Sequence, residues 1–347
     1  MKILHCITKL KDGGAQTQLN ILINNEKNFK HVVVSYDDHE DDQNTYYKLI
    51  QRSNILKKWK NFRRILKIEK PDIIHIWLPA VFHVYFLPSL FLPAKRILGI
   101  RNVYKLENLK RYIHLFIYFF CKNVVSNTHI GDQRGWFKKV YKNKNYFFIP
   151  NAIKFEINPP KKVNVVNNNN TKQLLFVGRL VNQKNIINLL DALSLIKKLN
   201  WELKIIGNGQ LRQKLQEKIV NLKLTHKVSI FEFNNKIEEY YKKADALILP
   251  SFTEGLPNVV LEAASFQNII LLSDIPQHKR WFTHNQNALL FNPHDKNEIK
   301  TSIIRFLDMD VNERFNYNLN AYDVIKNLSK EAYIEKYTQM YYKINNL

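Results

Sequence analysis

The sequence predicts an α/β protein made of two doubly wound parallel-sheet domains. The chain has 347 residues, more than one hydrophobic core usually serves. Short apolar runs alternate with longer segments of helical period in both halves, which is typical of βαβ units. A polar, proline-bearing stretch from Asn158 to Asn170 interrupts this series, and the series then restarts.

The first half predicts a Rossmann-like domain over residues 1–152. Because strands and helices alternate, we expect a parallel sheet covered on both faces. The expected strands are Lys2–Ile7, Val32–Tyr36, Ile73–Trp77, Arg96–Ile100, Val124–Ser126 and Phe147–Ile149. The expected helices are Ala15–Asn25, Leu56–Glu69 and Leu109–Cys121.

The second half predicts a similar domain over residues 172–325, after a linker at 153–171. Two sheets of this kind present their carboxyl ends to a ligand cleft. The stretch Lys296–Leu347 reads as helical, and residues 326–347 are expected to return to the first domain. The expected strands are Leu174–Val177, Leu203–Ile206, Val228–Phe231, Ala246–Leu249 and Ile269–Leu272, and the expected helices include Ile186–Lys198 and Leu211–Leu222.

The composition favours a cytoplasmic globular protein. Its hydrophobic content is 45%, and the two cysteines, Cys6 and Cys121, argue against a disulfide framework. The first residues read as a strand, with no signal-peptide pattern. The longest apolar stretch, Ile76 to Ala94, contains three prolines and reads as a strand end followed by a buried or interfacial helix rather than a membrane span.

The positive charge is concentrated in the first half. The whole chain has a net charge of +23, and residues 1–152 alone hold 26 Lys and Arg against 11 Asp and Glu. This excess suggests an anionic partner, although an AT-rich genome would also enrich lysine. The apolar segment Arg111–Lys122, flanked by further cations, is equally consistent with a core helix and with contact to an anionic membrane.

Three segments follow predicted strands and carry residues suited to a phosphorylated ligand. Gly13-Gly14 precedes a helix, where glycines let the backbone approach a phosphate, although a tight turn explains the pair equally well. In the segment from Gly178 to Asn185, Arg179 and Lys184 offer cations for phosphate oxygens, unless both are simply solvated.

The third segment runs from Ser251 to Ala263 and carries two glutamates. Carboxylates accept hydrogen bonds from sugar hydroxyls, so Glu254 and Glu262 are candidates to bind a donor sugar and a ribose. Apolar neighbours surround Glu262, and a carboxylate in such a setting needs a partner. We therefore favour a functional role over an ordinary helix-surface position.

Gly178-Arg179-Leu180 with Lys184, followed by Glu254 and Glu262 in an E-x7-E spacing, resembles the signature of the family 4 retaining glycosyltransferases of GT-B fold. The resemblance extends over the chain. It includes Gly13-Gly14, the segment Ile205–Gly209, and the segment Ala244–Ser251 that precedes the E-x7-E.

The resemblance implies roles for these residues. Arg179 and Lys184 would neutralise the donor diphosphate in place of a metal ion, so no metal or cofactor is expected. Glu254 would contact the donor sugar and Glu262 the ribose. The segment Phe231–Asn235, with Phe233, would border the base. The remaining donor-binding residues that the resemblance implies are Gly13, Gly14, Gly178, Gly209, Gly255, Leu256 and Asn258.

The sequence departs from the family pattern on the acceptor side. Many relatives carry a histidine after the fourth strand, where this chain has Arg101. Arg101 and His75 are candidate acceptor contacts, with a structural role the stronger interpretation for His75. The acidic run Asp37–Asp42 has no second ligand cluster and reads as a solvated loop.

We therefore expect a metal-independent hexosyltransferase-type enzyme that uses a nucleotide sugar, with UDP favoured over GDP. It would build surface polysaccharide or a lipid-linked glycan, with a polyprenyl diphosphate acceptor, at the inner face of a bacterial cytoplasmic membrane, without binding nucleic acid. The alternatives are a nucleotide-sugar epimerase of the same fold, and a non-enzymatic basic protein that binds membrane or nucleic acid.

Overall fold

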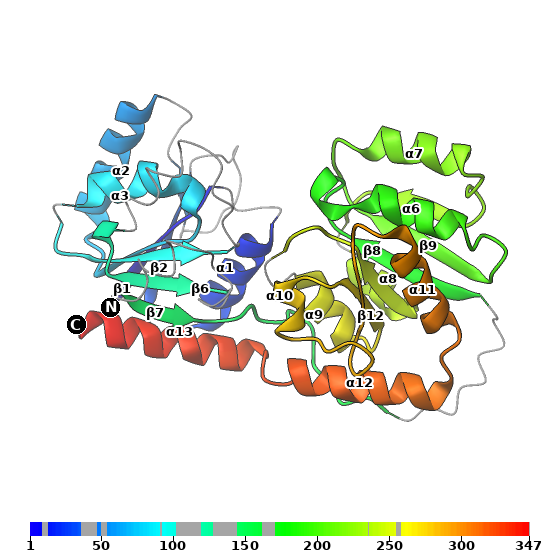
Figure 1. Ribbon diagram of the computed structural model, residues 1–347. Helices are drawn as coiled ribbons and strands as arrows, with labels where there is room; N and C mark the ends of the chain where they lie inside the picture. The colour runs from blue at the N-terminus through cyan, green and yellow to red at the C-terminus, as the bar shows by residue number, and fades with distance from the viewer. Residues whose placement is uncertain are drawn as a thin grey trace. The chain divides into compact units, whose positions relative to one another are not determined.

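The computed structural model describes residues 1–8, 13–35, 47–49, 54–90, 92–101, 119–127, 144–161, 171–234, 236–254 and 258–346. The chain forms two compact units. Unit 1 consists of Met1–Ala152 and Lys330–Leu347, and unit 2 of Ile153–Ser329. The units are described separately below (Figure 1).

Unit 1 is built on a seven-stranded parallel sheet with the order β3-β2-β1-β4-β5-β6-β7. Side chains of successive residues enter different cores, as the period of a strand requires. Ile3 packs on one face of the sheet, whereas Leu4 and Cys6 pack on the other. The strands are β1 (Lys2–Cys6), β2 (Lys30–Ser35), β3 (Tyr47–Leu49), β4 (Ile73–Ile76), β5 (Lys95–Ile100), β6 (Asn123–Ser126) and β7 (Asn145–Phe148).

Helices cover both faces of this sheet. One core includes residues of α2 (Ile55–Glu69) and α3 (Phe82–Ser89), which follows the short helix η1 (Pro79–Val81). The other core includes residues of α1 (Gly14–Asn25) and α13 (Lys330–Asn345). Tyrosines spaced four residues apart on α13 point inward, at Tyr333, Tyr337 and Tyr341. The helix that follows unit 2 in sequence therefore completes the core of unit 1 (Figure 1).

A chain of buried polar groups crosses unit 1. Trp77 Nε1 donates to His5 Nδ1 at 3.0 Å, so the hydrogen of neutral His5 is on Nε2. His5 Nε2 lies 2.9 Å from His31 Nδ1, and His31 Nε2 lies 3.0 Å from Glu26 Oε2. Burial holds the pKa of His5 and the pKa of His31 below the ordinary value. Every ring nitrogen of His5 and His31 thus has a hydrogen-bond partner while both rings are neutral.

Unit 2 contains a six-stranded parallel sheet with the order β10-β9-β8-β11-β12-β13. Both sheets confirm the predicted doubly wound fold class. The strands are β8 (Lys172–Val177), β9 (Trp201–Ile206), β10 (Val228–Phe231), β11 (Ala246–Leu249), β12 (Ile269–Ser273) and β13 (Leu289–Phe291). The helices are η3 (Asn182–Lys184), α6 (Ile186–Ser194), α7 (Arg212–Asn221), α8 (Ile237–Lys243), α9 (Asn258–Ser265), α10 (Pro276–Lys279), α11 (Lys296–Leu307) and α12 (Val311–Ile325).

Several details differ from the expectations. The short strands β3 and β13 had no counterpart in the prediction. The C-terminal stretch divides into α11, α12 and α13, and the side chain of Asp310 caps the first turn of α12 after α11 has ended. The first residues assigned to the linker pack instead against the core of unit 2, through Ile153, Phe155 and Ile157.

Other expectations fall on residues that are not described. The acidic run Asp37–Asp42 and most of the expected helix Leu109–Cys121 lie outside the described residues. The apolar stretch from Ile76 forms η1 and α3, whose residues are largely buried. None of the helices in the described part of the chain has the length and apolar character of a membrane span.

Candidate functional site

The strand order of unit 2 places its topological switch point between β8 and β11. The connection from β8 leads to one side of the sheet and the connection from β11 to the other. In open α/β sheets, ligands bind beside the carboxyl ends of the strands at such a point. Gly178 to Lys184 follow β8, and Ser251 to Glu254 follow β11. The structure therefore brings two of the predicted segments to the same edge.

Lys184 and Glu254 form an ion pair across this switch point. Lys184 Nζ lies 2.5 Å from Glu254 Oε1, and the two side chains are only 11% and 10% exposed. A pair in such a position is weakly screened by salt and solvent. The predicted phosphate-binding cation and the predicted sugar-binding carboxylate are thus joined in one ion pair.

Main-chain and amide hydrogen bonds fasten the two loops together. Phe252 N donates to Gln183 O at 2.9 Å, and Gln183 Nε2 donates to Thr253 O at 2.7 Å. Asn185 adopts the left-handed conformation, with φ of 56°, and its Nδ2 donates to Pro250 O at 3.1 Å and to Pro293 O at 2.7 Å. These bonds fix the backbone that carries Lys184 and Glu254.

Glycines allow the ends of β8 and β9 to approach closely. Gly178 N donates to Ile206 O at 3.0 Å, and a Cβ added to Gly207 would lie 1.9 Å from Gly178 O. A Cβ on Gly209 would likewise lie 2.4 Å from Leu180 O. A Cβ on Gly178 meets no atom closer than Lys184 Cε at 3.4 Å. Gly207 and Gly209 are thus required by the backbone packing, whereas Gly178 leaves space beside Lys184.

Glu262 is buried within α9 and has the partner that its burial requires. Tyr241 of α8 donates its hydroxyl to Glu262 Oε2 at 2.9 Å. Burial raises the pKa of the Glu262 carboxyl, while the charge of Lys154 and the bond from Tyr241 act to lower it. Glu262 is therefore held in a polar setting within an apolar helix.

His278 of α10 lies in the same part of unit 2. Its Nδ1 is 2.9 Å from Ser273 O and must carry the hydrogen, which leaves Nε2 as an acceptor in the neutral ring. Nε2 is buried, and no described residue bonds to it. Burial lowers the pKa of His278; the bond to Ser273 O and the charge of Glu254 act to raise it, and the charge of Lys184 acts to lower it. A neutral imidazole thus accompanies the ion pair.

The other predicted donor residues differ in their surroundings. Arg179 is exposed and makes no ion pair within the described part of the chain. Phe233 is exposed after β10, and Asn258 begins α9. Gly255 and Leu256, like Asn235, lie outside the described residues. In unit 1, Gly13 is in an extended conformation and Gly14 begins α1.

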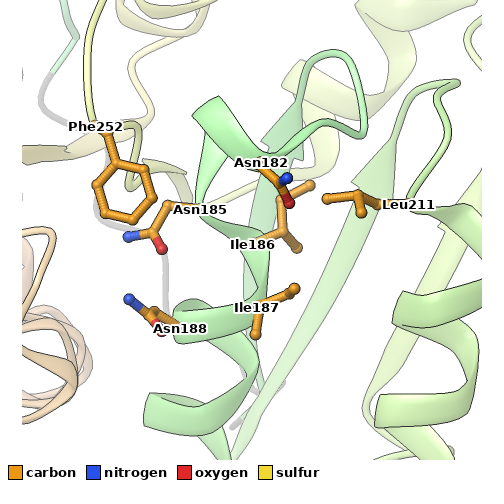
Figure 2. A pocket seen from close by; sticks show the side chains of 7 residues that line it. All are labelled: Asn182, Asn185, Ile186, Ile187, Asn188, Leu211 and Phe252. Carbon is orange, nitrogen blue, oxygen red and sulfur yellow. The ribbon is translucent and has the colours of Figure 1, made fainter.

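A cavity with a volume of about 240 Å³ opens beside α6. Figure 2 shows Phe252 at one side and Leu211 at the other, with the amides between them. Amides and an aromatic ring suit a hydroxylated ligand. The lining contains neither Lys184 nor Glu254, so the cavity adjoins the ion pair without including it. It is lined by Asn182, Asn185, Ile186, Ile187, Asn188, Leu211 and Phe252.

Residues 159–324 match the model of the family described as glycosyl transferases group 1. This match contains the loops after β8 and β11 and the helix α9. This part of the chain is similar to the group 1 glycosyltransferases. The match agrees with the expected resemblance to the family 4 enzymes, which is thereby confirmed.

Curated glycosyltransferases resemble much of the chain. The amylovoran biosynthesis glycosyltransferase AmsD of Erwinia amylovora is 29% identical over 217 residues, 61% of each chain. A Campylobacter jejuni α-1,4-N-acetyl-D-galactosaminyltransferase, named for a diNAcBac-PP-undecaprenol-linked glycan, is 28% identical over 229 residues, 64% of this chain and 60% of its own. The chain thus spans about six tenths of the length of these relatives.

A third relative covers more of the chain. The UDP-Gal:alpha-D-GlcNAc-diphosphoundecaprenol alpha-1,3-galactosyltransferase of Escherichia coli is 23% identical over 317 residues, 81% of this chain and 79% of its own. Among solved structures, HepE of Anabaena in complex with UDP-glucose has a TM-score of 0.82 at 15% identity, covering 99% of this chain and 100% of its own. The fold is thus the GT-B fold that the family signature implied.

The two candidate acceptor residues are both in the interior of unit 1. His75 lies within β4 with no exposed surface, and its Nδ1 is 2.8 Å from the Tyr341 hydroxyl of α13. Arg101 donates to Tyr337 Oη at 2.9 Å, and its guanidinium lies 4.5 Å from the centre of the Trp77 ring. The structure gives both residues contacts with the core and α13, and an acceptor role stays a prediction.

Sequence reasoning missed Tyr241 and His278. Tyr241 lies in α8, a short and strongly charged helix. Nothing in its sequence indicates which tyrosine of the pair Tyr240-Tyr241 is buried. His278 stands in a segment of four helical residues without a motif. Their partners lie in other elements, so only the tertiary structure shows them.

Proposed function

We propose that this protein is a retaining glycosyltransferase that moves a sugar from UDP to a glycan on a lipid-linked diphosphate. The observation that carries the proposal is the Lys184–Glu254 pair at the switch point of unit 2, with the exposed Arg179 on the same loop as Lys184. A cation for phosphate and a carboxylate for hydroxyls occupy adjacent positions where this fold binds ligands.

The chemistry requires charge stabilisation more than a nucleophile. As the bond between the anomeric carbon and the diphosphate oxygen breaks, Arg179 and Lys184 stabilise the charge on the departing diphosphate. The acceptor oxygen bonds to the same face of the anomeric carbon, and its proton passes to the leaving phosphate. Glu254 accepts a hydrogen bond from a hydroxyl of the donor sugar, and Glu262 accepts from the ribose.

Binding of the donor exchanges one ion pair for two contacts. In the structure Lys184 neutralises Glu254. With the donor bound, Lys184 turns to the phosphate and Glu254 to the sugar, so neither buried charge is left without a partner. The pair thus holds both side chains at the proposed donor site.

Relatives support the proposed donor and acceptor classes. HepE of Anabaena is seen in complex with UDP and with UDP-glucose. The Escherichia coli relative is named for UDP-Gal and a diphosphoundecaprenol acceptor, and the Campylobacter jejuni relative for a PP-undecaprenol glycan. These names lead us to propose a UDP-sugar donor and a polyprenyl diphosphate acceptor for surface polysaccharide synthesis.

The outer face of α2 supports peripheral binding to an anionic membrane. It carries exposed cations and no exposed acidic residue, since Glu69 pairs with Lys2. Leu56 and Ile68 flank these cations and are 67% and 61% exposed. A basic helix with apolar side chains at its margins suits an anionic lipid surface, here the inner face of the cytoplasmic membrane. The exposed cations are Lys57, Lys60, Arg63, Arg64 and Lys67.

Product analysis with labelled nucleotide sugars tests the enzymatic proposal. The protein is incubated with UDP- and GDP-sugars and a polyprenyl diphosphate glycan, with and without EDTA. Transfer to the lipid with unchanged anomeric configuration, from UDP-sugars and in EDTA, is expected. Isomerised nucleotide sugar without transfer would identify an epimerase. Turnover that is equal in wild type and Glu254→Gln would reject the proposed site.

Vesicle sedimentation tests the membrane proposal. Binding is expected with phosphatidylglycerol vesicles and not with phosphatidylcholine alone, and salt should weaken it. The variant K60E/R64E/K67E should lose most of this binding. The matched variant K197E/K198E/K214E changes the charge equally on exposed lysines of unit 2 and should retain it. Equal binding by both variants would exclude α2 as the contact.

A further inference from the structure

The hydrogen bond between Tyr241 and Glu262 joins two helices of unit 2. Tyr241 is in α8 and has no exposed surface, and Glu262 is in α9 with 8% exposure. The phenol donates to Oε2 at 2.9 Å. Within the described part of the chain, no side chain or backbone amide donates to Oε1. One carboxylate oxygen is therefore engaged by the protein, and the other has no such donor.

The Tyr241 ring is held from several sides. Phe266 stacks on it at 5.5 Å with an interplanar angle of 11°, and Phe155 meets its edge at 6.1 Å. Asn268 Nδ2 donates to Tyr241 O at 3.0 Å, which fixes the backbone at the end of α8. The position of the hydroxyl is therefore set by packing and does not depend on its bond to Glu262.

Lys154 supplies the charge that opposes the burial of Glu262. Burial raises the pKa of Glu262, and Lys154 is the largest influence that lowers it, followed by Tyr241. The Lys154 ammonium lies 4.6 Å from the centre of the Phe155 ring. Both residues belong to the segment directly after Ala152, where the chain enters unit 2. The segment that was expected to be a linker thus contributes an ammonium that acts on Glu262 and a ring that packs against Tyr241.

We propose that Tyr241 is the positioning residue of Glu262: its hydroxyl fixes the rotation of the carboxylate, and Oε1 is presented to a vicinal diol of the ligand. The inference rests on the proposed function, in which this diol is the ribose of the nucleotide. A freely rotating or protonated carboxyl would bind the diol less well, because it would lose both the fixed geometry and the ionic hydrogen bond.

The variant Tyr241→Phe isolates this role. It keeps the ring that packs between Phe155 and Phe266 and removes only the hydroxyl. We expect binding of UDP, measured by calorimetry, to weaken about tenfold, the size of one charge-assisted hydrogen bond. The KM for the UDP-sugar should rise with little change in kcat. Because Glu262 loses a group that lowers its pKa, the acid limit of UDP binding should move to higher pH.

A comparison with 2′,3′-dideoxy-UDP separates positioning from packing. Wild type should bind this analogue more weakly than UDP, whereas Tyr241→Phe should bind the two with nearly equal affinity. Tyr240→Phe, on the neighbouring half-buried residue, should behave as wild type. Unchanged UDP affinity in Tyr241→Phe, or an equal loss for both nucleotides, would overturn the inference.

The same measurements distinguish failure of the inference from failure of the proposed function. If wild type binds neither UDP nor GDP, the proposed function itself fails. If wild type binds UDP and Glu262→Gln weakens it while Tyr241→Phe does not, Glu262 binds the ligand without help from Tyr241. Thermal unfolding of each variant confirms that the protein remains folded during these measurements.

Discussion

Lys184 Nζ and Glu254 Oε1 are 2.5 Å apart, although 70 positions separate the two residues in the sequence. The pair joins the loop after β8 to the loop after β11. Removal of one partner leaves the other as a poorly solvated charge, so stability and catalysis are both affected. The two effects can be separated because only catalysis needs the charges themselves.

Glu254→Gln should lower kcat/KM about 100-fold or more, the usual loss for a group that stabilises a transition state. The free energy of unfolding should fall by about 1–3 kcal/mol, because the buried ammonium of Lys184 loses its counter-charge. The double variant Lys184→Met/Glu254→Leu should regain much of this stability and none of the activity. Urea unfolding and steady-state kinetics measure the two quantities. A fully active double variant would show that the pair has no catalytic role.

Gly207→Ala should destabilise unit 2 by about 1–3 kcal/mol, the usual cost of overpacking. The new Cβ would lie 1.9 Å from a backbone oxygen, that of Gly178, which has no rotamer available to move aside. Gly178→Ala is the matched control, since its Cβ meets only side-chain atoms, the nearest being Lys184 Cε at 3.4 Å. Thermal unfolding should show a large shift for the first variant and a small one for the second. A similar shift in both would contradict the packing argument.

His278→Asn should be more stable than His278→Gln. The Asn amide nitrogen occupies the position of Nδ1 and retains the bond to Ser273 O, whereas the Gln amide reaches only the position of Nε2. We expect a difference of about 1 kcal/mol in the free energy of unfolding, the value of one hydrogen bond. The reverse order, with Gln the more stable, would show that Nε2 makes the contact that matters.

Unit 1 should lose stability in mild acid. Burial lowers the pKa of His5, His31 and His75 in the folded state, so these rings stay neutral while an unfolded chain becomes protonated. The unfolded state therefore binds more protons below pH about 6.5, and stability falls as the pH falls from there. Above that pH the contribution of these histidines is fully present.

Urea unfolding between pH 7.5 and 5.5 measures this dependence. Each histidine that stays neutral adds up to about 1.4 kcal/mol per pH unit to the slope. His75→Phe keeps the ring stacked on Trp77 and should reduce the slope. His226→Gln, at an exposed position, should leave it unchanged. A slope that does not differ between wild type and His75→Phe would reject the role of His75.

The sequence was sufficient for the repeated βαβ organisation and for the loops that carry Arg179, Lys184 and Glu254. Apolar runs predict the longer strands. The residues directly after parallel strands lie at one edge of the sheet, so the loops that carry the site could be placed together. β3 and β13 were missed because three residues carry too little periodicity. The alternation of Ile153, Phe155 and Ile157 was a usable signal for packed extended chain, and the polar residues that follow concealed it.

Contacts between side chains far apart in the sequence could not be predicted from one sequence. His75 has the pattern of a residue at a strand end, and only α13, which supplies Tyr341, shows that it is enclosed. Likewise, the need of Glu262 for a partner followed from its apolar neighbours, but the identity of Tyr241 did not. Burial can be inferred from local pattern, whereas the choice of partner depends on how helices far apart in sequence pack.

The tyrosines of α13 affect the order in which the two units can fold during translation. Residues 1–152 leave the ribosome first, yet the helix that seals their core is translated only after all of unit 2. Unit 2 is continuous in sequence and can finish folding before Tyr333, Tyr337 and Tyr341, which complete the core of residues 1–152, have been translated. The N-terminal half therefore depends on the last helix for its completion, and a nascent chain stalled before residue 330 would hold one finished unit and one unfinished unit.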